Sequence, residues 1–241
     1  MRRWLVRSLV LAPLLGQDAV LEHARHVALQ RAANMPNFVA DEVAKRYSGH
    51  AGSNKWKYED TIESEITVNG IQITRQNFRR NGKPVRRFNG DGMPTTGFGA
   101  ALKPLFDPQC PTPLELENSE EVRGKSAQAY RFHSPANGCF GNLYGNLGGY
   151  NAARTGRVLI DAVAGEVLQF EEEATGFPKG FGFVQRNQVM TWDTVKIGDD
   201  SHWLPVAADF IWRGDGKDLY RTSVEYKNHR HFEAASNVTF K

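Results

Sequence analysis

The chain has 241 residues, with 30 lysines and arginines against 27 aspartates and glutamates, so its formal net charge is +3. The excess comes from Arg2, Arg3 and Arg7, because the first 16 residues contain no acid and the rest holds 27 basic and 27 acidic residues. A neutral body argues against nucleic-acid binding. The length suits one large antiparallel sheet, which can fold without a metal or many disulfides.

The N-terminal segment resembles a secretory signal peptide. Met1-Arg2-Arg3 is a short basic region, residues 4–15 are mostly apolar, and Gly16 offers a cleavage site. The segment is too short to span a bilayer, and no later stretch approaches the roughly 20 apolar residues of a membrane helix. We therefore expect a signal peptide at 1–16, a single β-rich domain at 17–241, and a periplasmic or secreted protein. The alternative is an apolar tail on a cytosolic protein.

Residues 19–34 are predicted to form the one long helix. Asp18 is a good N-cap, small apolar residues recur at helical spacing, and Pro36 ends the pattern. The next segment, residues 38–47, is ambiguous from its pattern. Its apolar residues fit a helix face, whereas the proline before it and the exit into Ser48-Gly49 suit a strand.

Three strands then form a meander, predicted at residues 56–68, 71–80 and 85–88. Asn69-Gly70 and Asn81-Gly82 provide the two turns, and Asn-Gly is a strong signal for a two-residue hairpin loop. After a Gly/Pro-rich loop, residues 97–106 are predicted to form a short helix. Pro104 lies near its end and should make that helix short or bent.

The rest of the chain reads as strands. A hairpin is predicted at 113–122 and 127–133, and residues 134–154 read as a long loop or an irregular edge strand. Further strands are predicted at 157–161, 166–173, 189–197, 203–213, 219–229 and 237–240. The expected class is mainly β (α+β): a large curved antiparallel sheet or unclosed β-barrel of about ten strands, with an N-terminal helix and a short lid helix.

The strand faces indicate how such a sheet is covered. In the strand at 203–213, the residues Val206, Ala208, Phe210 and Trp212 share one apolar face. A flat sheet of this size with one apolar face is unusual, and two helices are too few to cover it. A curved half-barrel around the helices would solve this and could leave an apolar ligand cavity. The sequence leaves this cavity and a fully packed core equally open.

If there is a cavity, aromatic and apolar side chains from three segments are candidates to line it. The short helix offers one face, the Gly-Phe loop near residue 180 offers two rings, and the sheet offers two more. The predicted ligand-binding residues are Phe98, Leu102, Phe106, Phe181, Phe183, Phe210 and Trp212.

Catalytic and metal-binding motifs are weak, and we predict no catalytic residue, metal or cofactor. His229 and His231 share a strand face, but a metal site needs a third ligand, for which Glu233 is the near candidate. His23 and His26 are spaced to share a helix face, with Glu22 as the one clear acidic candidate beside them. Adjacent strand residues point to opposite faces, so the acidic triplet at residues 171–173 is interpreted as a solvated edge.

Cys110 and Cys139 are the two cysteines of the chain, and both lie in loop-like surroundings. An even count in an exported protein favours a disulfide, which would close a loop of about 30 residues. The alternative is two buried free thiols.

Four motifs in this order resemble a family of exported bacterial proteins similar to the outer-membrane lipoprotein carrier (LolA/LolB-like) fold. They are Met35-Pro36-Asn37-Phe38, the segment Phe98–Phe106, the segment Asp161–Val167, and the segment Glu225–Phe232. The resemblance implies an unclosed antiparallel β-barrel whose helices lie across an apolar cavity that holds acyl chains. It also implies that residues 38–47 form the first strand. It supplies no catalytic residue.

The leading functional hypothesis is an exported, non-enzymatic protein that binds a lipid, an acyl chain or another apolar ligand in a half-barrel, in envelope lipid or lipoprotein handling. Neither nucleic acid nor a membrane span is expected, and an envelope protein is a candidate partner. Two alternatives remain: an envelope scaffold or interaction module with a filled core, and a hydrolase whose site is scattered in sequence.

Overall fold

The computed structural model describes residues 14–70, 72–86, 102–109 and 112–232. In this part of the chain, eleven strands form one antiparallel sheet that does not close. These strands are β1 (Phe38–His50), β2 (Trp56–Asn69), β3 (Gln72–Arg80), β4 (Lys83–Pro84), β5 (Leu114–Val122), β6 (Lys125–Ser134), β9 (Ala153–Asp161), β10 (Val167–Thr175), β11 (Phe183–Ile197), β12 (Asp200–Gly214) and β13 (Asp218–His231). The strand order is β4-β3-β2-β1-β13-β12-β11-β10-β9-β6-β5.

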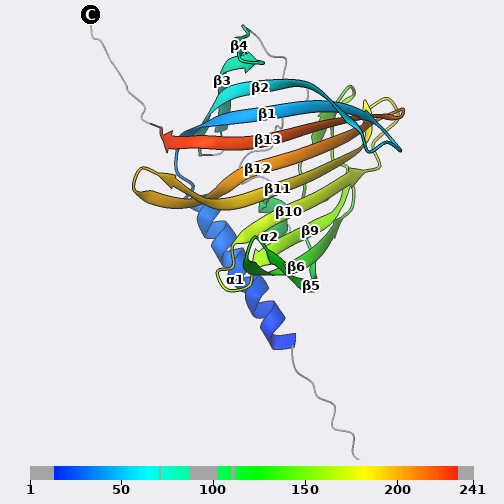
Figure 1. Cartoon of the computed structure of the whole chain (residues 1–241). Coiled ribbons are helices and arrows are strands. Elements are labelled where there is room, and N and C mark those ends of the chain that lie inside the picture. The colour runs from blue at the N-terminus through cyan, green and yellow to red at the C-terminus, as the bar shows by residue number, and fades with distance from the viewer. Residues whose placement is uncertain (1–13, 71, 87–101, 110–111, 233–241) are drawn as a thin grey trace, which may run out of the picture.

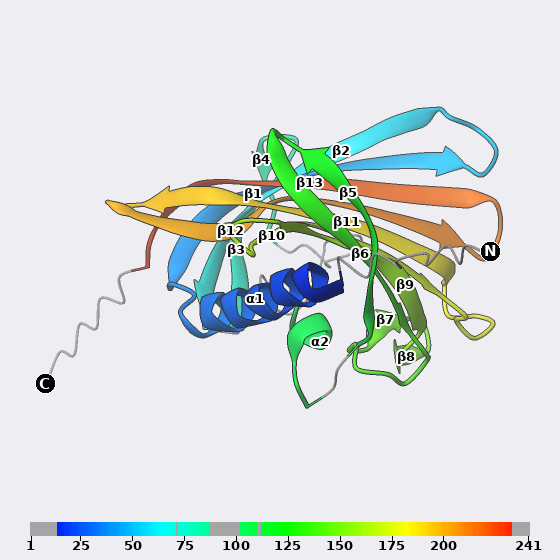
Figure 2. The same ribbon diagram turned by 90° about the horizontal axis from the view of Figure 1, so that it is seen from below.

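The sheet is strongly curved and wraps around two helices (Figure 1). Register shifts interrupt several of its ladders, for example between Arg46 and Tyr47 in β1 and between Thr191 and Trp192 in β11. Such bulges bend a strand and increase its twist. Helix α1 (Leu14–Ala33) lies across the hollow of the sheet, with the short helix α2 (Lys103–Phe106) beside it (Figure 2).

Alternating burial along the strands places one face of the sheet in the core. In β2, Ile62, Ile66 and Val68 are buried with Asp60 and Ser64, whereas the residues between them are partly exposed. The turn after β2 uses Gly70 at a φ of 57°, a left-handed conformation that glycine adopts without strain. The buried faces of β1, β2, β6 and β9 to β13 join Leu21 and Ala24 of α1 in one continuous core, which we call the interior.

The expected fold class is confirmed, because the described chain is mostly strand and its large antiparallel sheet stays open. The segment 38–47, which the family resemblance assigned to the first strand, lies within β1. The long helix is also confirmed. It begins earlier than expected, at Leu14, inside the segment predicted as a signal peptide. The strand predicted at 237–240 lies outside the described residues.

Three local predictions differ from the structure. Of the strand expected at 85–88, the described residues Val85 and Arg86 are not in a strand, and the two-residue β4 lies just before them. Of the helix expected at 97–106, the described part is helical only at Lys103–Phe106, consistent with a proline at the start of α2. The segment 134–154 contains a small hairpin, β7 (Leu143–Gly145) with β8 (Gly148–Tyr150), paired apart from the main sheet.

No helix among the described residues is long and apolar enough to cross a membrane. The segment 1–13 lies outside the described part, so the signal peptide stays a prediction.

Candidate functional site

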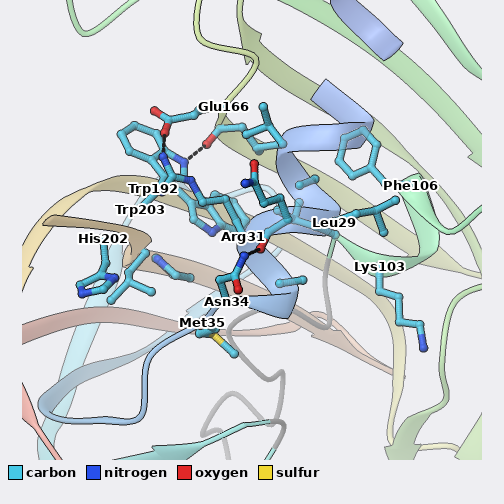
Figure 3. Close-up of a pocket in the computed structure, with 18 of the residues that line it drawn as sticks. Leu29, Arg31, Asn34, Met35, Lys103, Phe106, Glu166, Trp192, His202 and Trp203 are labelled. Atoms are coloured by element: carbon cyan, nitrogen blue, oxygen red, sulfur yellow. Dashed lines mark hydrogen bonds and ion pairs between the residues drawn. The ribbon is translucent and has the colours of Figure 1, made fainter. Parts of the chain in front are cut away.

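A pocket of about 860 Å³ lies between α1, α2 and the interior face of the sheet (Figure 3). One wall is the C-terminal half of α1 and the turn after it, and the opposite wall is the start of β12 with neighbouring parts of β10 and β11. The lining residues are Val27, Ala28, Leu29, Gln30, Arg31, Ala32, Asn34, Met35, Pro36, Val68, Gly70, Ile73, Leu102, Lys103, Phe106, Asp107, Ala164, Glu166, Val167, Trp192, His202, Trp203, Leu204 and Pro205. Most of them are apolar.

Two tryptophans form the sheet side of the pocket. Trp192 is buried, and Trp203 is half-buried with its indole N–H donated to the carbonyl of Val167 at 2.8 Å. The Lys125 ammonium lies 4.5 Å from the ring centre of Trp203, within the range of a cation–π contact. The Trp203 ring therefore has a fixed orientation, with its polar edge satisfied and its apolar surface left for the pocket.

The helical side of the pocket is small and apolar. Ala28 and Met35 pack partly against the core, and Phe106 of α2 is buried while also lining the pocket. The hydroxyl of Thr112 donates to the carbonyl of Pro104 at 2.8 Å and ties down the chain that leaves α2. Because α2 is a single turn, its position depends on this packing more than on its own hydrogen bonds.

Charged side chains of the lining are paired with one another. Arg31 bonds Glu166 at 2.6 Å and joins α1 to the turn between β9 and β10, while Lys103 lies 3.9 Å from Asp107. The same turn is held by Asp161, whose carboxylate accepts the backbone N–H groups of Val163 and Ala164 at 2.9 Å. Burial alone would raise the pKa of Asp161, but these backbone donors and the Lys125 ammonium together outweigh it and lower that pKa.

The predicted ligand-binding residues are distributed among three places. Leu102 and Phe106 line the pocket, while Phe210 and Trp212 stack with ring centres 5.6 Å apart in and beside the core and are not among its lining residues. Phe98 lies outside the described residues.

The Gly-Phe loop packs elsewhere. Phe181 and Phe183 lie 5.0 Å apart between ring centres, and both contact Phe177, forming an aromatic cluster next to Tyr150 of β8. They are not among the pocket's lining residues. Contact between these rings and a ligand stays a prediction.

Trp192 and Trp203, the largest side chains of the pocket, are not among the residues predicted from the sequence. A bulge between Thr191 and Trp192 brings Trp192 opposite Pro205, and it leaves both Leu204 and Pro205 buried. The extra residue of this bulge lies in β12, so period-two alternation fails beside Trp203, whereas Trp192 keeps the alternation of β11. In the sequence, Trp192 lies within the strand predicted at 189–197 and Trp203 begins the strand predicted at 203–213, which by itself does not indicate a pocket.

The described residues contain no group of three or more histidine, cysteine or acidic side chains placed to hold a metal ion. His229 packs against Phe38, with ring centres 5.5 Å apart. Burial lowers its pKa, and Asp41 opposes that shift. Glu233, the third ligand weighed for this pair of histidines, lies outside the described residues, as does Cys110. The disulfide between Cys110 and Cys139 therefore stays a prediction.

The interpretation of the acidic triplet at 171–173 as a solvated edge is wrong for its central member. Glu172 is buried, and both of its oxygens lie 2.9 Å from Nη1 of the buried Arg154. Arg186 and Gln188 of β11 are buried beside them. Glu172 points inward because it alternates with Phe170 and Ala174 on the core face of β10. We call Arg154, Glu172, Arg186 and Gln188 the interior arginine cluster.

No protein-family model matches the chain, and no curated protein matches it. Solved structures do match over nearly the whole length. A LolA superfamily protein from Nitrosomonas europaea covers 93% of this chain and 97% of its own, at 9% identity and a TM-score of 0.35. An outer membrane lipoprotein-sorting protein domain from Vibrio parahaemolyticus covers 91% and 95%, at 9% identity and a TM-score of 0.44.

A DUF1329 family protein from Desulfovibrio piger covers 92% of this chain and 97% of its own, at 9% identity and a TM-score of 0.37. One of these structures carries the name of the superfamily that the sequence motifs resemble.

Proposed function

We propose that this protein binds one acyl chain, or an apolar ligand of similar shape, in the pocket between α1, α2 and the sheet. The pocket itself carries the proposal. Its volume of about 860 Å³ lies in the range of pockets for small ligands, and apolar side chains dominate its lining. Burial of apolar ligand surface is the main source of affinity that such a lining can supply.

Two of the polar contacts in the pocket support an apolar ligand as well. Arg31 and Glu166 neutralise each other at 2.6 Å, and the indole N–H of Trp203 is used by a backbone carbonyl. A nucleophile activated by a neighbouring base is the arrangement that covalent catalysis needs. The paired lining groups support binding without catalysis, so the proposed protein is a carrier and not an enzyme.

The proposed setting is the bacterial envelope. The basic and apolar leader at 1–16 supports export, and the motif resemblance to the lipoprotein carrier fold supports a role in lipid or lipoprotein handling. An envelope protein that delivers or receives the ligand is the proposed partner.

Mass spectrometry of gently purified protein, together with uptake of a fluorescent fatty acid, tests the proposal. We expect a co-purified lipid and saturable uptake. Ala28 is a partly buried lining residue on α1, so Ala28→Trp should fill the pocket and lower uptake at least tenfold. Ala33→Trp is the matched control, because Ala33 is exposed on the same helix and is not a lining residue. Absence of both lipid and uptake in the wild type would contradict the proposal.

The competing function is an envelope scaffold with a filled core. It is favoured by the extent of the packed interior, where Phe132, Phe170 and Phe210 are fully buried away from the pocket lining. If the protein is such a scaffold, Ala28→Trp and Ala33→Trp should bind the partner equally well. Neither variant should then differ from the wild type in fatty-acid uptake.

A further inference from the structure

The interior arginine cluster contains more positive than negative charge. Two guanidinium groups, Arg154 and Arg186, share a single carboxylate, Glu172. Arg154 holds that carboxylate with two contacts of 2.9 Å, whereas Nη1 of Arg186 stays 3.6 Å from it, beyond hydrogen-bond distance. All three side chains are at most 6% exposed, so water does not screen the excess charge.

The cluster also holds donors without acceptors. Nη2 of Arg154 donates a hydrogen bond to the carbonyl of Gly141 at 2.6 Å, and Nη2 of Arg186 donates one to the side-chain oxygen of Gln188. Three buried nitrogens remain without a partner: Nε of Arg154, Nη1 of Arg186 and Nε2 of Gln188. Each of them is a donor, so the group that would complete the cluster must offer acceptors.

Aromatic rings compensate only part of this charge. The guanidinium carbon of Arg154 lies 5.1 Å from the ring centre of Phe140, and that of Arg186 lies 5.5 Å from Phe210. Burial lowers the pKa of Arg186 to about 10, with Arg154 adding to that shift and Glu172 opposing it. A pKa of that size leaves Arg186 charged at neutral pH. A buried charge of this kind calls for a counter-charge and further hydrogen bonds.

The cluster faces the same interior as the pocket. Along β11 the buried positions alternate as Arg186, Gln188, Met190 and Trp192, and Trp192 lines the pocket. With about 3.4 Å per residue, Arg186 lies roughly 20 Å along the strand from that tryptophan. Across the sheet, Gln188 pairs with Glu172 on one side and with Phe210 on the other.

We propose that Arg186, with Gln188 and Nε of Arg154, binds the anionic head of an amphiphilic ligand, a carboxylate or phosphate oxyanion. This inference rests on the proposed function, because the acyl chain of the same molecule is what enters the interior. One oxyanion supplies the missing negative charge and acceptors for the three unpartnered donors. Guanidinium groups bind such oxyanions through short, charge-assisted hydrogen bonds.

Calorimetric titration of the delipidated full chain at pH 8 tests the inference with three probes. Dodecanoate has both chain and carboxylate, dodecanol has the chain alone, and acetate has the carboxylate alone. We expect dodecanoate to bind at least about tenfold more tightly than dodecanol, and acetate to show no measurable binding. Dodecyl phosphate, run against inorganic phosphate, repeats the comparison for the other oxyanion.

Arg186→Met should remove the preference by weakening dodecanoate about tenfold while leaving dodecanol unchanged. Gln188→Met should reduce the preference by a smaller factor and serves as the second variant should Arg186→Met fail to fold. Arg213→Met, the same chemical change at an exposed position of β12, should leave both affinities unchanged.

The outcomes separate the two proposals. Equal affinity for dodecanoate and dodecanol overturns the head-group site and leaves the acyl pocket standing. Acetate or inorganic phosphate that binds as tightly as the matching amphiphile also overturns it, since the site would then serve a free anion. A wild-type chain that binds neither dodecanoate nor dodecanol overturns the proposed function and the head-group site together.

Discussion

Two buried ion clusters face the interior, and they differ in how completely they are satisfied. Glu42 is fully buried and bonds both Nε and Nη2 of Arg75, at 2.7 and 2.9 Å, and it also accepts the hydroxyl of Ser64 at 2.9 Å. There, one acid meets one base. In the interior arginine cluster one acid, Glu172, serves two bases and leaves donors unpartnered.

The difference separates a cluster whose buried charges are balanced without a ligand from one whose charges are not. Tyr226 lies on the same face as Glu42, and burial raises its pKa, so its phenol remains a protonated donor to that carboxylate. The cluster around Glu42 therefore has acceptors and donors in balance and acts as a structural element. The interior arginine cluster lacks an acceptor, which is the property expected of a binding site.

The largest effect should come from breaking the balanced pair. Glu42→Gln leaves the charge of Arg75 in a mostly buried place without its counter-charge, and removing one partner of a buried pair costs about 3–5 kcal/mol of unfolding free energy. Urea denaturation measures the loss. The double variant Glu42→Met with Arg75→Met removes both charges and should recover most of it. A loss below about 1 kcal/mol for Glu42→Gln would show that this pair is not structural.

The second effect concerns the cover of the interior arginine cluster. Cys139 directly precedes Phe140, whose ring lies over Arg154, and Gly141, whose carbonyl accepts Nη2 of Arg154. A disulfide from Cys139 to Cys110 would fix this cover, and the chain-entropy model gives roughly 3–4 kcal/mol for a loop of about 30 residues.

Alkylation of the denatured, exported protein tests that disulfide. We expect no free thiol before reduction and two after it. Reduction should increase hydrogen exchange in residues 139–154 and leave β1 to β3, around Glu42, unchanged. Two alkylated cysteines before reduction would contradict both the disulfide and its use as evidence for export.

Much of the fold is readable from the sequence, because strand alternation and turn chemistry are local properties. The segment predicted at 56–68 is β2 with one further residue, and its Asn69-Gly70 turn lies where expected. The strand predicted at 85–88 is not formed at Val85 and Arg86, because β4 pairs for only two residues beside the turn at Asn81-Gly82. A local sequence pattern does not predict how far the partner strand extends.

The site is less predictable because it depends on contacts distant in sequence. The pocket wall at Trp203 lies beside a bulge in β12, and the buried carboxylate of Glu172 is paired by Arg154 on one neighbouring strand and Arg186 on the other. One signal was available: Phe170, Glu172 and Ala174 alternate, which places the glutamate on the apolar face. A charged residue in phase with a buried face indicates a paired charge inside the sheet.

The third effect should be a gain in stability. In ligand-free protein, Arg186→Met leaves Arg154 and Glu172 as a balanced pair and removes an unpartnered buried donor. The unfolding free energy should rise by roughly 1–3 kcal/mol, the range for an unsatisfied buried polar group. Thermal unfolding with and without dodecanoate measures it. A loss of stability in the ligand-free variant would place Arg186 with the structural charges, beside Arg75, and contradict the contrast between the two clusters.

The smallest effect comes from a third cluster, where Asp60 also meets two arginines. Its carboxylate bonds Arg46 and Arg80 at 2.6 Å, but the Arg80 side chain is 56% exposed, so water accommodates the excess positive charge. The hydrogen bonds from Arg46 lower the pKa of Asp60, against the opposing effect of burial.

Because the folded pKa of Asp60 is depressed, its contribution to stability is present above the unfolded value of about 3.9 and is lost as the pH falls below it. Urea denaturation between pH 6 and pH 2 should show this acid loss in the wild type, with a smaller loss in Asp60→Asn. Near neutral pH, Asp60→Asn should lower the unfolding free energy, because it removes the ion pairs with Arg46 and Arg80. Arg80→Met should change the unfolding free energy little. If Arg80→Met instead raised stability as Arg186→Met is expected to, then excess charge alone, not its burial, would set the energy of these clusters, and the interior arginine cluster would lose its distinction as a binding site.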